Sequence, residues 1–149
     1  MGRRQRLRED VRMTPRRTGE IAFHHLVKGQ SSGVRVATAT VVRDQETWNG
    51  LWRSVTFGSS SPSEPPAVDW ASRMVVFVGI GTRNTGGYQV EITRLYEEDD
   101  AIRVYMRETC PGPRAMVTCA LTHPFHAVTS ARRPDHVVFD FRLEIVTRE

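Results

Sequence analysis

The histidines are the residues of this sequence that are the first candidates for a metal site. His123 and His126 have a spacing that helical metal ligands use, but Pro124 excludes a regular helix between them. His24 and His25 are neighbours on a predicted strand, so their side chains face opposite ways. Structural roles are therefore favoured over a metal site. The sequence also lacks a zinc-type Cys/His spacing, a Gly-x-Ser-x-Gly nucleophile motif and a phosphate-binding glycine loop. We accordingly expect a protein that is not an enzyme, with no catalytic residue, no metal ligand and no cofactor.

Two cysteines, Cys110 and Cys119, flank a loop that contains Pro111, Gly112 and Pro113. If the segments on either side were antiparallel strands, the two thiols would lie near enough for a disulfide. Two free thiols fit the sequence equally well, and the sequence leaves both alternatives open.

The residues from 68 to 92 predict the centre of the fold. Residues 74–80 are apolar almost without interruption, which predicts a strand buried on both faces. Tyr88, Val90 and Ile92 then alternate with polar residues, which predicts a strand with one solvent face. Residues 82–87 between them include two adjacent glycines and predict a tight loop.

One helix is predicted, over residues 45–55. Asp44 is a suitable N-cap, because its carboxylate can accept hydrogen bonds from the first-turn amides. Apolar side chains recur at i, i+3, i+4 and i+7 and form one stripe that would pack on a sheet: Trp48, Leu51, Trp52 and Val55. The following segment, 57–67, is rich in serine and proline and predicts a loop.

The rest of the chain predicts further strands. Residues 20–27 and 34–43 are compatible with a hairpin, and the acidic turn 97–100 predicts another, with a bulge near Arg94. Other predicted strands are 115–120, 125–129 and 137–145. The fold class predicted is mostly β: a sandwich or partly open barrel of seven or eight mainly antiparallel strands with one packed helix.

Composition indicates an ordinary globular chain of 149 residues, with 39% hydrophobic and 26% charged residues. We expect residues 19–149 to form a single β domain, with no membrane span and no secretory signal in the chain as given. Residues 1–18 predict a disordered tail, because they have no hydrophobic period. The net charge of +4 is unevenly placed, because this tail is strongly basic and the remaining residues are nearly neutral. Only Glu9 and Asp10 oppose the seven arginines of the tail: Arg3, Arg4, Arg6, Arg8, Arg12, Arg16 and Arg17. A nucleic-acid contact is one interpretation of the tail, but a solvated extension is favoured because no aromatic residue lies among the arginines.

Several motifs together resemble the PrcB C-terminal domain family. They are residues 47–52 (TWNGLW), 68–70 (VDW) leading into 74–79 (MVVFVG), 85–92 (TGGYQVEI), 111–113 (PGP) and 123–128 (HPFHAV). The resemblance covers about residues 40–130. Asn84 stands where the family favours proline before Thr-Gly-Gly-Tyr.

This resemblance implies a non-catalytic, protein-binding accessory module that helps to assemble or stabilise a bacterial protease complex. The partner is then a protein, such as a protease, and the location is the cell envelope or the exterior. We take the loop Asn84, Thr85, Gly86, Gly87 and Tyr88 as the candidate partner-binding site.

The same loop is also similar to a loop of chagasin-type cysteine-protease inhibitors, which are immunoglobulin-like sandwiches. Arg133-Pro134 is similar to a second loop of those inhibitors, although Asp135 replaces the expected aromatic residue. Protease inhibition is therefore the alternative function.

Overall fold

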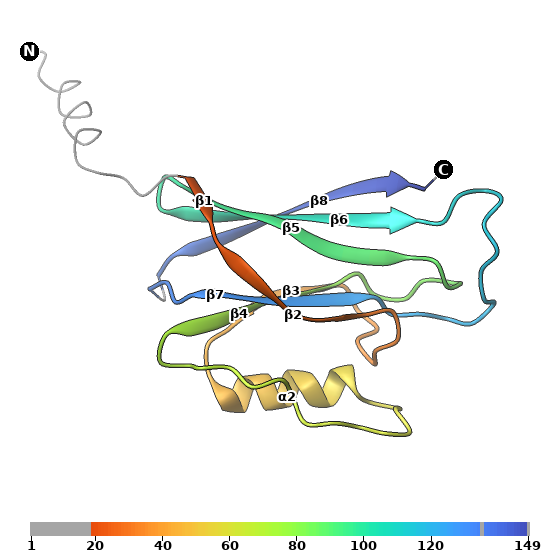
Figure 1. Ribbon diagram of the computed structural model, residues 1–149, viewed down its shortest axis with the longest axis horizontal. Helices are drawn as coiled ribbons and strands as arrows, with labels where there is room; N and C mark the ends of the chain where they lie inside the picture. The colour runs from red at the N-terminus through yellow and green to blue at the C-terminus, as the bar shows by residue number, and fades with distance from the viewer. Residues whose placement is uncertain (1–18, 135, 149) are drawn as a thin grey trace, which may run out of the picture.

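Three layers make up the structure, a computed structural model that describes residues 19–134 and 136–148 (Figure 1). Two four-stranded sheets face each other, and one helix covers the far side of one of them. We call the sheet between the other sheet and the helix the middle sheet, and its partner the outer sheet. The predicted tail, residues 1–18, lies outside the described residues.

The outer sheet has the strand order β1-β5-β6-β8, and the middle sheet has the order β2-β7-β4-β3. All neighbours are antiparallel except β6 and β8, which are parallel. The sandwich prediction is confirmed, and the barrel alternative is not, because the described strands form two separate open sheets. In chain order the elements are β1 (Gly19–Ile21), β2 (Phe23–Gly29), β3 (Thr38–Val42), α2 (Gln45–Val55), β4 (Arg73–Gly79), β5 (Gln89–Glu98), β6 (Ala101–Cys110), β7 (Phe125–Ala131) and β8 (Val138–Thr147).

Strand β4 is buried on both faces, as its apolar run predicted. Val76 and Val78 join the core between the two sheets. Val75 and Phe77 join a second core between the middle sheet and α2. All four side chains have zero exposure, so one strand contributes to both cores of the molecule.

Helix α2 begins and ends at the predicted residues, and Asp44 caps it by accepting from the backbone N–H of Thr47 at 2.7 Å. The helix buries its tryptophans against the middle sheet. A buried indole N–H requires an acceptor, and here the acceptors are carbonyls of the serine- and proline-rich loop 57–67. The bonds run from Trp48 to Pro66 (3.0 Å) and from Trp52 to Ser63 (2.8 Å), so the loop is held along the helix.

The predicted hairpin between residues 20–27 and 34–43 is wrong. The first segment is two strands, because the chain crosses from the outer to the middle sheet at Ala22: Ile21 pairs with β5 and Phe23 pairs with β7. The second segment pairs with β4 and forms a strand only from residue 38. Before it, Gly33 donates to the carbonyl of Val55 at the end of α2, and Val34 is buried in the core between α2 and the middle sheet.

The strand predicted at residues 115–120 is also wrong. These residues belong to a long connection, 111–124, that runs along one end of the sandwich from the outer to the middle sheet (Figure 1). Without a strand at 115–120, the antiparallel geometry that would bring Cys110 and Cys119 together is absent. The structure contains both as free cysteines.

Other predictions for the outer sheet are confirmed. β5 and β6 form a hairpin whose turn residues, Asp99 and Asp100, have φ of 53° and 64°. The β5–β6 register shifts between Ile92 and Arg94, where the bulge was predicted. The last strand has the predicted alternation, but it pairs in parallel with β6.

Two-sided burial of β4 can be tested by placing a hydroxyl on each face. Val75→Thr and Val76→Thr keep the side-chain shape, but each buries an unpaired polar group, so each should cost about 1–3 kcal/mol of unfolding free energy. Urea denaturation measures both effects. Glu91→Thr on the exposed face of β5 is the control and should change stability by less than about 0.5 kcal/mol. A cost at only one of the two valines would contradict the two-core arrangement.

Candidate partner-binding surface

The loop between β4 and β5, residues 80–88, is shaped by two glycines in a conformation that other residues rarely adopt. Gly81 has a φ of 82° and Gly87 a φ of 92°. A Cβ on Gly87 would also lie 2.8 Å from Cγ1 of Val117. The loop therefore needs glycine at this position both for its backbone conformation and for the closeness of residue 117.

This loop is bonded to the 111–124 connection. Arg83 and Thr122 exchange two backbone hydrogen bonds of 2.8 and 3.0 Å, as in an antiparallel bridge. The backbone N–H of Gly86 donates to the carbonyl of Thr118 at 3.1 Å. The hydroxyl of Thr122 donates to the carbonyl of Thr85 at 2.8 Å. The two segments consequently form one surface at this end of the sandwich.

The predicted site residues divide by exposure. Asn84 is exposed, whereas Thr85, Gly87 and Tyr88 are partly buried and Gly86 is buried. Most of the predicted loop thus packs against the chain itself, and Asn84 is the predicted residue most open to a partner.

Two exposed apolar side chains lie in the 111–124 connection. Met116 is 97% exposed and Leu121 is 62% exposed, and each precedes a residue that contacts or bonds the glycine loop. Together with the exposed Thr82 and Asn84, they form what we call the loop surface. The sequence did not indicate the exposure of Met116 and Leu121, because the composition of 115–120 predicted a strand in which Met116 would be partly covered.

An ion pair fixes the loop to the outer sheet. Nε of Arg83 lies 2.7 Å from Oε2 of Glu108, and a second guanidinium nitrogen lies 3.0 Å from Oε1. The third nitrogen donates to the carbonyls of Ile80 and Thr82. Hydrogen bonding to the buried Glu108 raises the pKa of Arg83 above its ordinary value, so the guanidinium stays charged.

Glu108 is a residue whose importance the sequence could have shown. Ile102, Val104 and Met106 point inward along β6, and Glu108 continues the same alternation into the core side. A carboxylate at an inward position is costly to bury unless it is paired. The position of Glu108 in the alternation of β6 therefore predicts a cationic partner.

His126 joins the two sheets. Its Nδ1 accepts from the backbone N–H of Ile92 at 2.9 Å, beside the β5 bulge. The proton must therefore be on Nε2, which lies 3.1 Å from Nδ1 of His25. Burial, helped by the charges of His25 and Lys28, lowers the pKa of His126 from 6.5 to about 4. Both ring nitrogens are occupied, and His123 contributes only backbone hydrogen bonds to its neighbours.

Comparison with known proteins agrees with the motif resemblance. The fold defines the chain as a β-sandwich with one covering helix, and the model of the PrcB C-terminal family matches residues 74–130. This match confirms the similarity to the PrcB C-terminal family, and it runs from β4 through both segments of the loop surface to β7. No curated protein matches the chain. No solved structure matches it either.

Membrane-spanning helices and metal-binding clusters are both absent from the described residues. No helix among them is long and apolar enough to cross a membrane. No group of three or more His, Cys, Asp or Glu side chains in residues 19–134 and 136–148 is arranged to hold a metal ion.

Gly87→Ala tests the packing of the loop. The added Cβ meets Val117 and Pro111, and alanine is strained at a φ of 92°, so the variant should lose more than about 1 kcal/mol of unfolding free energy. Asn84→Ala, at an exposed position of the same loop, is the matched control and should be close to neutral. Equal stability of the two variants in urea denaturation would show that the loop is not packed as described.

His126 should make stability fall as the pH is lowered. In the unfolded chain the imidazole takes up a proton below about pH 6.5, whereas in the folded chain it stays neutral to about pH 4. The unfolded state therefore binds more protons in this window, and about 3 kcal/mol of stability present above pH 6.5 should be lost by pH 4. Unfolding free energies measured across this range test the effect.

His126→Asn is the control for the titration. Its side-chain oxygen can still accept from the Ile92 N–H, but it does not titrate. The variant should be less stable at neutral pH and should show a clearly shallower loss of stability between pH 6.5 and 4. A wild-type slope that persists unchanged in the variant would assign the pH dependence to other groups.

Proposed function

We propose that this chain is a non-catalytic protein-binding module that contacts a protein partner, such as a subunit of a protease complex, through the loop surface. The observation that carries the proposal is the combination of exposed apolar and polar side chains on two segments held rigidly together. Met116 and Leu121 expose apolar area beside Asn84, and the Arg83–Glu108 pair holds their support in place. Exposed apolar side chains on an ordered surface are typical of protein contacts.

The family similarity supports the choice of the loop surface as the contact, because the matched region includes it. Residues 74–130 comprise the glycine loop, the 111–124 connection and the strands that hold them. The similarity is to a family named for a C-terminal region of PrcB, and its implied part in a protease complex is the basis for naming a protease as the partner class.

The inhibitor alternative has less support from the geometry. A loop that enters a protease cleft must project from its scaffold, whereas Gly86 is buried and bonded to Thr118. Stoichiometric inhibition of a papain-type protease by the purified chain would nevertheless replace the proposal with this alternative.

A capture experiment tests the proposed surface. The purified chain is immobilised, incubated with an extract of the native host, and the retained proteins are identified by mass spectrometry. The wild type should retain a protein that the double variant Met116→Asp, Leu121→Asp retains about tenfold less, because both substitutions place charge where apolar contact is expected.

Phe57→Asp provides the matched control. Phe57 is 69% exposed, but it follows α2 in the helix layer and is not part of the loop surface. The control should retain the partner as the wild type does. If both variants and the wild type retain the same proteins in equal amounts, the loop surface is not the contact.

A further inference from the structure

Strand β8 has a free edge. The described strands give the two sheets four edge strands, β1, β8, β2 and β3. β1 has three residues and β3 has five, and the pairing of β2 contains a register shift. β8 has ten residues, pairs with β6 without a shift and contains no glycine, proline or lysine. Proteins normally shorten, bend or charge an edge strand to prevent pairing. β8 is the longest of the four and is regular along its length, and its three charged residues alternate in sign.

The inner face of β8 is apolar but incompletely covered. Phe139 and Phe141 pack against the core between the sheets. Leu143 and Ile145 continue the same alternation, yet they are 45% and 62% exposed. The strand therefore carries two large apolar side chains that nothing in the described residues fully covers.

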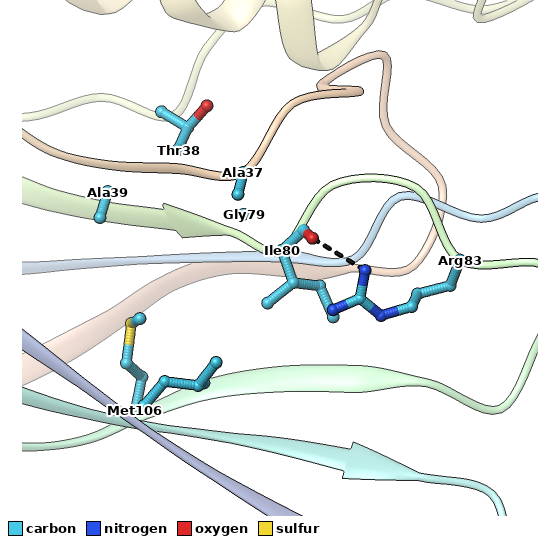
Figure 2. Close-up of a pocket in the computed structure, with 8 residues that line it drawn as sticks. Ala37, Thr38, Ala39, Gly79, Ile80, Arg83 and Met106 are labelled. Atoms are coloured by element: carbon cyan, nitrogen blue, oxygen red, sulfur yellow. Dashed lines mark hydrogen bonds between the residues drawn. The ribbon is translucent and has the colours of Figure 1, made fainter.

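A cavity lies beside this uncovered half of the strand. It has a volume of about 250 Å³ and is bordered by Ala37 and Ala39 of the middle-sheet side and by Met106 and Leu143 of the outer sheet. Figure 2 shows Met106 across the cavity from these alanines.

The charges of β8 indicate which strand fits. Its outer face carries Asp140, Arg142 and Glu144 in succession. If a second β8 lies antiparallel with the two Leu143 residues opposite each other, each Arg142 faces the Glu144 of the other copy. The same register places each Phe141 opposite an Ile145. Opposite charges and apolar pairs directly across an antiparallel ladder are both favourable.

Antiparallel pairings of two β8 strands that are centred on Arg142 or Phe141 are less favourable. With the two Arg142 residues opposite each other, like charges meet there, and Asp140 faces Glu144. With the two Phe141 residues opposite each other, Arg142 meets Asp140, but Ile145 extends past the partner's strand and stays uncovered. The Leu143 register satisfies both the charges and the exposed apolar residues.

We propose that this chain forms a two-fold symmetric dimer by antiparallel pairing of β8 with β8 of a second copy, with Leu143 on the symmetry axis. The two outer sheets then become one continuous sheet of eight strands. The interface is isologous, so each favourable contact occurs twice. This surface is separate from the loop surface, so the dimer does not depend on the proposed function.

Charge-reversal variants test the dimer and its register. In Arg142→Glu the introduced carboxylate faces Glu144 of the second copy, and in Glu144→Arg the introduced guanidinium faces Arg142 of the second copy. Each repulsive contact occurs twice in the dimer. Each variant should therefore raise the dimer dissociation constant by about 100-fold or more, measured by sedimentation equilibrium. Within the chain, Arg142 is paired with Asp140 and Glu144 with Arg107, and both variants break such a pair. These pairs are solvent-exposed and contribute little to stability, so the fold should be retained, which circular dichroism checks.

Mixing the two variants distinguishes specific pairing from general damage. In a mixed dimer the carboxylate introduced at position 142 of one copy faces the guanidinium introduced at position 144 of the other. The remaining native Arg142 faces the remaining native Glu144, so the 1:1 mixture should dimerise although neither variant does so alone.

Three outcomes would overturn the proposal or its register. A wild-type chain that is monomeric at all soluble concentrations would overturn the dimer, as would a mixture that stays monomeric. Dissociation by Arg142→Glu but not by Glu144→Arg would overturn this register in favour of the Phe141-centred one. Met116→Asp changes the loop surface and should leave the dimer intact. Dimerisation and partner binding at the loop surface can therefore be tested separately.

Discussion

Burial of β4 on both faces is the constraint on which the rest of the structure depends. A strand without a solvent face requires a layer on each side, and no short chain segment can supply both. The outer sheet covers Val76 and Val78, and α2 covers Val75 and Phe77. The three-layer arrangement and the position of α2 follow from this requirement. The tryptophan bonds to loop 57–67 then complete the helix layer.

Two polar groups on the strands of the outer sheet find their hydrogen-bond partners outside that sheet. The β5 bulge disturbs the regular ladder near Ile92, and His126 of the middle sheet accepts the Ile92 N–H. The carboxylate of Glu108, on the inner side of β6, is neutralised by Arg83 from the loop after β4. The first contact joins a strand of each sheet, and the second joins β6 to the loop that connects the two sheets. Because apolar packing is non-directional, these directional hydrogen bonds help to fix the position of one sheet relative to the other.

Local patterns predicted the fold where one pattern dominated. The α2 stripe, the apolar run of β4 and the alternation of β5 and β6 each specify an element without reference to distant residues. The failures are non-local. Nothing near Ala22 in the sequence shows that the chain changes sheets there, and residues 115–120 have strand-like composition but pair with the glycine loop instead of a strand. The candidate site also has features that a local pattern predicts and features that depend on distant residues. The glycines of the loop were recognisable, because a positive φ is a local property. The exposure of Met116 and Leu121 depends on how two segments about thirty residues apart pack together, which no local pattern specifies.

The two proposed surfaces are geometrically compatible. β8 runs parallel to β6, and Arg148, just after β8, donates to the carbonyl of Cys110 at the start of the 111–124 connection. The loop surface therefore lies toward the C-terminal end of β8. Antiparallel pairing about Leu143 reverses the direction of the second copy, so the two loop surfaces are directed toward opposite ends of the joined sheet. In the proposed dimer, a partner bound at one loop surface would not compete with a partner bound at the other.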